Sequence, residues 1–240
     1  MEQREQAELF RRMHLAPPLL ALPNAWDVAS AKAFAALPGC RALATTSAAV
    51  ARSLGWEDGE QAPVAEMVQV AGRIAAAVDV PLTADLEAGY GDPVATARAA
   101  WAAGVVGMNF EDSPAGRMNG VSDQVQLIRE VHAAAPELVV NARVDVFLHG
   151  SKDVAEAIER GNAYLAAGAD CVYPIFCPTA AIAELAAGID GPVNVLAIGD
   201  VPGPAELQAL GVARLTWGAG LAASAYAEAA RIVAPVLSGG

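Results

Sequence analysis

Short apolar runs with the composition of strands alternate with alanine-rich stretches from one end of the chain to the other. This alternation predicts repeated strand–helix units and a parallel sheet, rather than separate all-α and all-β blocks. Eight runs have the length and character of strands. They are Leu19–Pro23, Ala42–Thr46, Pro81–Leu86, Val105–Phe110, Leu138–Val144, Cys171–Phe176, Val193–Ile198 and Arg214–Trp217.

The stretches between these runs have the composition of helices. Pro93, directly after Asp92, is typical of a helix start, because proline suits the first helical position. A glycine before a strand, as in Ala102-Ala103-Gly104, is typical of a helix end. The predicted helices are Ala62–Val78, Pro93–Ala103, Ser122–Ala135, Lys152–Ala167, Ala180–Ala187, Pro204–Leu210 and Gly220–Val236.

Eight such units, with no linker, charge run or low-complexity segment between them, predict an α/β fold of the closed (β/α)8 TIM-barrel type. The length of 240 residues suits one such barrel. An open doubly wound sheet is the alternative, although no Gly-x-Gly-x-x-Gly sequence follows the first run. We predict a single domain over residues 1–240, with a short helix before the barrel and another after it.

Composition limits where the protein works and what it binds. The apolar fraction is 55%, yet the longest stretch without a charged residue is Met13–Trp26, which three prolines interrupt. We therefore expect no membrane span, and the charged start of the chain predicts no secretory signal and a cytoplasmic location. A net charge of -12 disfavours nucleic acid and anionic membranes as partners. Cys40, Cys171 and Cys177 contain no C-x-x-C pair, which favours free thiols.

The segment Pro81–Asp92 carries the most informative chemistry, because an apolar run ends there in two acids and a glycine-rich turn. Asp85 and Glu87 are two residues apart, so in a strand they share one face. Like charges at the end of a strand repel each other unless a proton or a cation relieves them. A divalent cation, Mg2+ or Mn2+, is the expected partner. A solvated polar strand end is the alternative.

In a (β/α)8 barrel the carboxyl ends of all strands meet on one face, where barrel enzymes place their sites. Carboxylates that face one arginine there indicate a site for a divalent cation and an anionic substrate, which Arg143 would bind in a bidentate manner. The alternative for Arg143 is a structural ion pair with Asp145. The polar strand ends and loops include Thr45, Thr46, Ser47, Asp58, Asp85, Glu87, Asn109, Glu111, Asp112, Asn141, Arg143, Asp145 and Asn194.

Seven polar or glycine-rich segments form a combined pattern: Leu22–Asp27, Thr46–Ala48, Leu54–Gly59, Thr83–Gly91, Asn109–Ser113, Asn141–Asp145 and Pro192–Val195. Together they resemble the isocitrate lyase/phosphoenolpyruvate mutase superfamily, over roughly residues 15–226. The resemblance implies an α/β barrel, a magnesium site, and bond cleavage or formation in 2-oxo acids or related substrates through an enolate.

The resemblance also implies roles for individual residues. The position of Asp85 binds the metal directly, and the positions of Asp58, Glu87 and Glu111 hold metal-bound water. Asp58 and Arg143 count among the catalytic residues. The positions that contact substrate are Ser47, Ala48, Asp85, Arg143 and Asn194.

One loop departs from the lyase pattern. The isocitrate and methylisocitrate lyases carry Lys-Lys-Cys-Gly-His on a mobile loop after the fourth strand, with the cysteine as general acid. Here the loop Asp112–Ser122 contains neither Cys nor His, which argues against those two activities. The phosphonomutases and phosphonopyruvate hydrolases use Lys or Arg and Asn near the phosphonate. Arg117 and Asn119 are therefore candidate catalytic residues, with a solvated turn as the alternative.

Three hypotheses follow. The first is a Mg2+-dependent lyase or decarboxylase that cleaves a carbon–carbon bond in a small, oxaloacetate-like 2-oxo acid, because decarboxylation needs little acid–base machinery. The second is a phosphonomutase or phosphonopyruvate hydrolase, and the third is an inactive metal-binding barrel. We also expect a homo-oligomer, a dimer or tetramer, formed by pairing of the alanine-rich helix Gly220–Val236.

Overall fold

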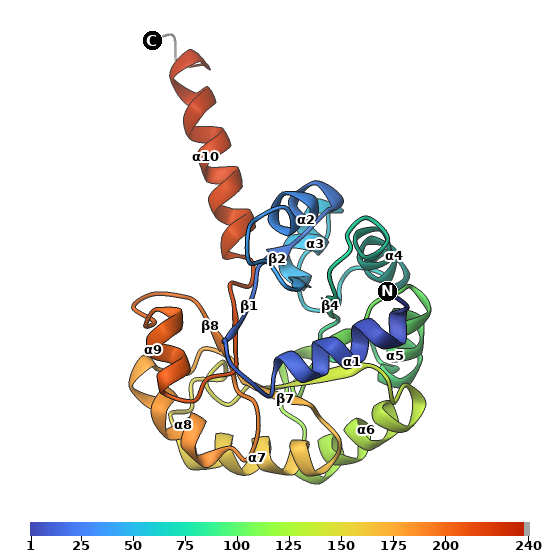
Figure 1. Cartoon of the computed structure of the whole chain (residues 1–240), viewed down its shortest axis with the longest axis vertical. Coiled ribbons are helices and arrows are strands. Elements are labelled where there is room, and N and C mark those ends of the chain that lie inside the picture. Colours follow the sequence, from blue (N-terminus) through green and yellow to red (C-terminus); the bar gives the residue numbers. More distant parts are fainter. Residues whose placement is uncertain (238–240) are drawn as a thin grey trace.

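The computed structural model describes residues 1–237, and its parallel strands form a ring that helices surround (Figure 1). The last three residues of the predicted domain lie outside the described part. The strands are β1 Leu20–Leu22, β2 Asn24–Ala25, β3 Leu43–Thr45, β4 Leu82–Asp85, β5 Gly107–Glu111, β6 Val139–Val144, β7 Cys171–Pro174, β8 Asn194–Leu196 and β9 Arg214–Thr216.

The first predicted strand is divided at Pro23, and this division is part of how the ring closes. Before Pro23, β1 pairs with β9; after it, β2 pairs with β3. Parallel pairing then continues in order from β3 to β7. A bridge between Val172 and Val193 joins β7 to the residue before β8, and β8 pairs with β9. The ring is therefore continuous, and the predicted (β/α)8 barrel is confirmed.

Each predicted helix is present, and two short ones were missed. The missed helices α2 and α3 follow the first two barrel strands. The side chain of Asp27 accepts a hydrogen bond from the backbone of Ser30, and this capping box was the overlooked signal for α2. The helices are α1 Gln3–Met13, α2 Val28–Ala35, α3 Ser47–Ser53, α4 Val64–Ala75, α5 Pro93–Ala102, α6 Val121–Ala134, α7 Val154–Ala166, α8 Ile182–Gly188, α9 Pro204–Ala209 and α10 Gly220–Leu237.

Helix α1 packs against the amino-terminal ends of the barrel strands. Phe10 is fully buried in a cluster with Leu20 and Val139. At its carboxyl end Arg11 pairs with Asp170, 2.6 Å between Nε and Oδ1. The base of the barrel is thus closed by apolar packing, which leaves the opposite end, where the strands finish, open for a site.

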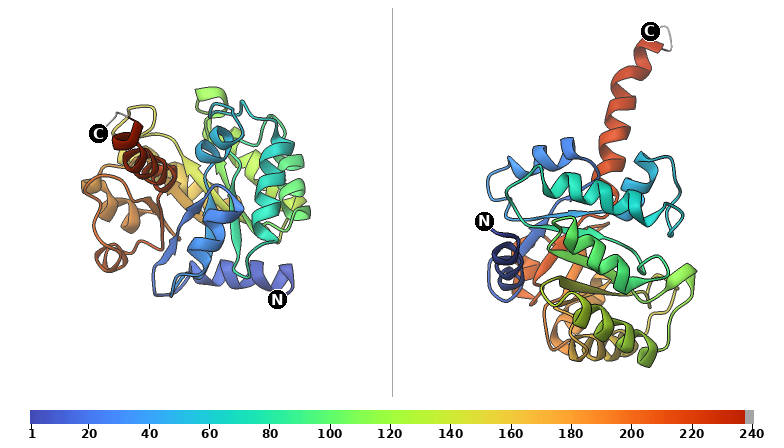
Figure 2. Two further views of the ribbon diagram at one scale, coloured as in Figure 1. Left: turned by 90° about the horizontal axis from the view of Figure 1, so that it is seen from above. Right: turned by 90° about the vertical axis from the view of Figure 1, so that its right-hand side faces the viewer.

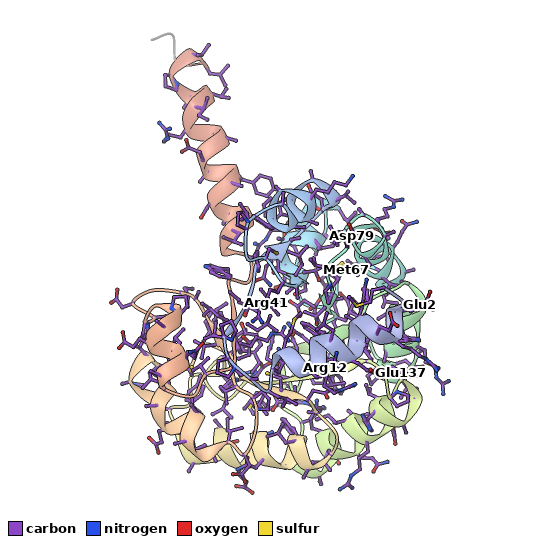
Figure 3. The ribbon with its side chains drawn as sticks, viewed as in Figure 1. Glu2, Arg12, Arg41, Met67, Asp79 and Glu137 are labelled. Atoms are coloured by element: carbon purple, nitrogen blue, oxygen red, sulfur yellow. The ribbon has the colours of Figure 1, made fainter. Side chains whose placement is uncertain are left out.

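Helix α10 projects away from the barrel instead of packing against it (Figures 1 and 2). Beyond its first turns, its side chains stand clear of the body in Figure 3. Near its start, Tyr226 contacts Trp26, with ring centroids 6.0 Å apart. Towards its end Ile232 and Leu237 are 62% and 80% exposed.

Two further sequence predictions concern thiols and membranes. Cys40, Cys171 and Cys177 are all free, as predicted. Within residues 1–237 no helix combines the length and the apolar character that crossing a membrane requires.

Candidate active site

Asp85 ends β4 with its carboxylate held from two sides. Ser47, the first residue of α3, donates to Oδ2 from both its backbone N–H and its hydroxyl, each at 2.9 Å. The Asn109 amide donates to Oδ1 at 3.2 Å, and the hydroxyl of Thr45 accepts from the Asp85 backbone N–H at 2.8 Å. Because these donors fix its orientation, the carboxylate is prepared to bind a ligand without rearrangement.

Glu87 lies in the turn after β4, where the backbone is strained. Its φ of 51° is left-handed, as are those of Glu60 at 61° and Tyr90 at 55°. The Glu60 N–H and the Tyr90 hydroxyl donate to the two Glu87 carboxylate oxygens, each at 2.7 Å. Such conformations persist only when the surroundings impose them, and they concentrate at functional sites. The three residues thus form one unit that orients the Glu87 carboxylate.

The acids of the site disfavour one another's charge. The pKa of Glu87 is raised to about 7, chiefly by burial and also by the charges of Asp85 and Asp58, although the hydrogen bonds from Tyr90 and Glu60 oppose the shift. Burial and Asp85 together raise the pKa of Asp58. Burial also raises the pKa of Glu111, although Arg143 opposes this. A cation placed among these carboxylates would offset both the desolvation and the repulsion.

Arg143 lies between two acids. Its Nε and Nη2 atoms donate to the two oxygens of Asp145, at 2.6 and 2.9 Å, and its Nη1 pairs with Glu111. Burial lowers the pKa of Arg143, but Glu111 and Asp145 raise it by more, so the group stays a cation. The predicted alternative, an ion pair with Asp145, is therefore present, and the same guanidinium also lines the cavities described below.

A buried network supports Asp145 from behind. The Ser113 hydroxyl donates to Asp145, and the Asp145 backbone N–H donates to Asp112 Oδ1 at 3.0 Å. From α7, the Tyr164 hydroxyl donates to Asp112 Oδ2 at 2.7 Å, and Arg160 Nη1 lies 3.3 Å from the same oxygen. The position of Arg143 thus depends on helix α7 as well as on its own strand.

Hydrogen bonds of Asn119 fix the carboxyl-terminal end of the loop after β5. The backbone N–H of Asn119 donates to the Asp112 carbonyl at 2.8 Å, and its side-chain amide donates to Gln124 at 2.9 Å. Arg117 is exposed. Among residues 1–237, those that line the cavities at this end of the barrel do not include Arg117 or Asn119. Their catalytic role stays a prediction.

Two adjoining cavities, of about 490 and 340 Å3, open at the carboxyl ends of the strands and share Asp58, Arg143 and Leu148. The larger is acidic, and it is also lined by Glu87 and Glu111. The smaller holds Ser47, Ala48 and Asp85 on one side. Its other side is largely apolar and comprises Tyr173, Ile175, Phe176, Leu196, Ala197, Ile198 and Trp217.

Seven of the predicted site residues therefore gather at these cavities: Ser47, Ala48, Asp58, Asp85, Glu87, Glu111 and Arg143. Asn194 lies elsewhere. It is fully buried at the start of β8, and its Oδ1 accepts from the Thr216 hydroxyl at 3.3 Å. Thr216, rather than Asn194, lines the smaller cavity. A substrate contact by Asn194 stays a prediction.

Tyr173 is the most informative residue that the sequence reasoning missed. It pairs in register with Arg143 on the neighbouring strand and lines the smaller cavity. Burial raises the pKa of its hydroxyl, which therefore keeps its proton at neutral pH. Alternation within the predicted strand Cys171–Phe176 was the available signal, because it points Cys171, Tyr173 and Ile175 to one face.

The donor set fits a magnesium ion better than a metal with a full protein cage. In residues 1–237, no three side chains of His, Cys, Asp or Glu lie close enough together to form a metal cluster. Magnesium usually takes one or two carboxylates directly and keeps several waters. The site matches this coordination, because hydrogen bonds orient one carboxylate, Asp85, and further acids line the adjoining cavities.

A barrel with acids, an arginine and two adjoining cavities at the carboxyl ends of its strands has the architecture of a barrel enzyme. The sequence matches the phosphoenolpyruvate phosphomutase family over residues 10–237. The chain belongs to this family, and with it to the isocitrate lyase/phosphoenolpyruvate mutase superfamily of lyases, mutases and hydrolases.

Several relatives show the range of this group. An uncharacterised Mycobacterium tuberculosis protein is 37% identical over 92% of this chain and 88% of its own length. The 2-methylisocitrate lyase of Bacillus subtilis is 33% identical, and the match covers 72% of this chain and 60% of that enzyme. A Burkholderia cenocepacia structure described as a candidate phosphonomutase is 36% identical, with a TM-score of 0.88, over 98% of this chain and 99% of its own.

One solved structure of similar fold contains Mg2+. A phosphonopyruvate hydrolase was solved with oxalate and Mg2+. It is 22% identical, with a TM-score of 0.86 over 99% of this chain and 87% of its own. At this identity the likeness concerns the fold.

Proposed function

We propose that this protein is a Mg2+-dependent carbon–carbon lyase or decarboxylase that acts on a small, oxaloacetate-like 2-oxo acid. One observation carries this proposal: within residues 1–237, Arg143 is the one cationic side chain that lines either cavity. A planar guanidinium matches one carboxylate. A phosphonate or phosphoryl group carries more charge and calls for further cations. The 2-methylisocitrate lyase among the relatives supports carbon–carbon chemistry.

The metal site in this proposal lies where the two cavities adjoin, with Asp85 in the smaller cavity, Glu87 and Glu111 in the larger, and Asp58 in both. Asp85 would bind Mg2+ directly, with Asp58, Glu87 and Glu111 holding its waters. When bound, Mg2+ supplies Lewis-acid stabilisation of the negative charge that develops on the substrate's 2-oxo oxygen. Arg143 orients the substrate carboxylate, and its own orientation is maintained by Asp145.

Tyr173 is the residue that we assign to proton transfer. In decarboxylation the bond to the departing carboxylate breaks, its electron pair stays on the 2-oxo fragment as an enolate, and CO2 leaves. The enolate carbon then needs a proton. Tyr173 lines the smaller cavity together with Arg143, and its hydroxyl carries a proton at neutral pH. The tyrosinate would regain its proton from solvent.

The apolar wall of the smaller cavity has two consequences. Leu196, Ile198 and Trp217 reduce the contact of the bound substrate with water, which strengthens its electrostatic interactions with Arg143. The same wall offers room for an apolar substituent on the substrate. We therefore expect alkyl-substituted 2-oxo acids to be accepted as well as unsubstituted ones.

Carbon–phosphorus chemistry is the second candidate, as a phosphonomutase or a phosphonopyruvate hydrolase. The 36% identity to a structure described as a candidate phosphonomutase favours it. For this chemistry Arg117 would have to reach the phosphonate, which requires the loop after β5 to close over the cavity. An inactive metal-binding barrel is the third.

A substrate panel tests the proposal. Purified protein would be assayed against oxaloacetate, 3-alkyl oxaloacetates and phosphonopyruvate, with Mg2+ and with EDTA. We expect Mg2+-dependent release of CO2 or of a carbon fragment from an oxaloacetate-like acid, abolished in Asp85→Ala. Turnover of phosphonopyruvate alone would overturn the proposal in favour of the second candidate. No turnover of any compound, with intact metal binding, would favour the inactive barrel.

A further inference from the structure

Arg214 is an unusual residue in the interior of this barrel. It begins β9 and is fully buried, and no Asp or Glu within residues 1–237 forms an ion pair with it. Its Nε and Nη1 atoms have no hydrogen-bond partner in the described part of the chain. Burying an unpaired cation costs folding free energy, and such costs are retained where function requires them.

Within the described residues, Arg214 makes one side-chain hydrogen bond, and this bond points towards the proposed metal site. Its Nη2 atom lies 3.3 Å from Asn109 Oδ1, and the Asn141 amide donates to the same oxygen at 2.8 Å. With two donors facing one end of the Asn109 side chain, that end must be the oxygen. The Asn109 amide hydrogens therefore face Asp85, whose Oδ1 they contact at 3.2 Å.

We propose that Arg214 is a positioning residue of the metal site, which acts on Asp85 by fixing the orientation of the Asn109 side chain. This rests on the proposed function, in that Asp85 is taken to bind a divalent cation. Without its donors, the Asn109 side chain can rotate and present its oxygen to the carboxylate. Asp85 then loses a donor and gains a repulsive neighbour.

Two effects of removing Arg214 have opposite signs, which makes the proposal decidable. If Arg214 acted only through its charge, it would repel a bound cation, and removing it would strengthen metal binding. If it acts by positioning, removing it weakens metal binding, because a preoriented ligand becomes mobile. The direction of the change in affinity therefore separates the two.

The test measures Mn2+ affinity on the intact protein, from the electron paramagnetic resonance signal of the free ion. We expect Arg214→Met to weaken Mn2+ binding by about tenfold, the scale of one lost charge-assisted hydrogen bond. Arg214→Lys should restore most of the affinity. Arg11→Met, which removes a cation at the base of the barrel away from Asn109, is the matched control and should leave the affinity unchanged. Unchanged or tighter binding by Arg214→Met overturns the proposal.

A second pair of variants tests the route through Asn109. Asn141→Leu removes the other donor to Asn109 without changing any charge, so it should weaken Mn2+ binding in the same direction. It keeps the test decisive if Arg214→Met does not fold. In an Asn109→Ala background, Arg214→Met should have no further effect on affinity. Additive losses would show that Arg214 acts by another route and would overturn the proposal.

The metal assignment itself has a separate control. Asp85→Ala should abolish Mn2+ binding if the proposed site is correct. Mn2+ binding that persists in Asp85→Ala would refute the metal-site assignment, and with it the proposed function. If Asp85→Ala abolishes Mn2+ binding and Arg214→Met leaves the Mn2+ affinity unchanged, only the proposed role of Arg214 is wrong.

Discussion

Asp145 accepts two hydrogen bonds from Arg143, at 2.6 and 2.9 Å, while the same guanidinium lines both cavities. The ion pair with Asp145 therefore does not exclude the proposed recognition of a substrate carboxylate by this arginine. Asp145 holds the planar group in place from behind, and Ser113 and Asp112 hold Asp145. A carboxylate that enters the cavity meets a guanidinium whose plane is already set, which lowers the entropic cost of binding it.

The first prediction concerns this geometry. Arg143→Lys should lower kcat/KM on the best substrate by at least about a hundredfold, because an ammonium is a point charge that cannot reproduce the planar fork. Mn2+ affinity should change far less. The exposed variant Arg129→Lys on α6 is the control. Steady-state kinetics that show full activity in Arg143→Lys would make Arg143 purely structural.

The second prediction concerns Asp85. Asp85→Ala should abolish Mg2+ binding in calorimetry without unfolding the barrel. Because the removed carboxylate no longer raises the pKa values of Asp58 and Glu87, the metal-free variant should be at least as stable as the wild type to heat. Asp79→Ala, at an exposed residue between α4 and β4 (Figure 3), is the matched control. Unchanged Mg2+ affinity in Asp85→Ala would refute the metal assignment.

The positions of these residues could be predicted because they follow from periodicity. In parallel strands the last polar residues share one edge, so Asp85, Glu111 and Arg143 must converge once the barrel closes. The barrel itself follows from eight regularly alternating units. Pro23 ends the predicted strand Leu19–Pro23, whereas in the structure it joins two short strands, β1 and β2. Proline lacks the N–H that an unbroken strand would use there.

The partners of these residues could not be predicted, because they depend on backbone conformations and packing that have no simple period. Glu60 and Tyr90 orient Glu87 only because both adopt left-handed φ values. Asn119 is of the residue type expected near a phosphonate. Its side-chain amide, however, donates a hydrogen bond to Gln124. Arginine side chains are usually exposed, so the burial of Arg214 could not be predicted from its residue type. The closed ring places this side chain in the interior of the barrel.

The third prediction concerns proton transfer. Tyr173→Phe should lower kcat by about a hundredfold or more, the usual contribution of a positioned acid, while Mn2+ affinity stays within about twofold. Tyr226→Phe, on the exposed part of α10, removes a hydroxyl outside the site and serves as control. A Tyr173→Phe enzyme with wild-type kcat would exclude this hydroxyl as the proton donor. A general loss of folded protein would show instead that the hydroxyl is structural.

The fourth prediction concerns acid stability. Burial, followed by the nearby Arg214, lowers the pKa of His14 from 6.5 to about 3, while hydrogen bonds to Phe10 and Arg11 oppose the shift. Between these values the unfolded chain binds a proton that the folded chain does not. The free energy of unfolding therefore falls as the pH drops from 6.5 towards 3, by up to about 1.4 kcal/mol per pH unit from this group.

Urea titrations at several pH values would measure how the free energy of unfolding depends on pH. Between pH 6.5 and 4 the free energy of unfolding of His14→Gln should fall less steeply with decreasing pH than that of the wild type. The two slopes should differ by up to about 1.4 kcal/mol per pH unit, which corresponds to one proton per molecule. Parallel slopes in the wild type and His14→Gln would contradict the buried, neutral state of His14.

The last prediction concerns assembly. We propose a homo-oligomer, a dimer or tetramer, that pairs helix α10, because Ile232, Val236 and Leu237 are 62%, 80% and 80% exposed on a helix that projects from the body. A monomer would leave this apolar surface in water. The small residues of the helix, among them Ala225 and Ala229, permit two helices to approach closely.

Light scattering at micromolar concentration should report the oligomer, and deletion of residues 220–240 should convert it to a monomer. Ile232→Asp should do the same by placing a charge in the paired surface, whereas Leu37→Asp, at a comparably exposed apolar residue of the barrel, should not. Dilution should lower activity before it lowers the circular-dichroism signal, because the proposed assembly would help to shield the site at the carboxyl ends of the strands from water. A monomeric wild type, or an assembly that survives the deletion, would contradict pairing through α10.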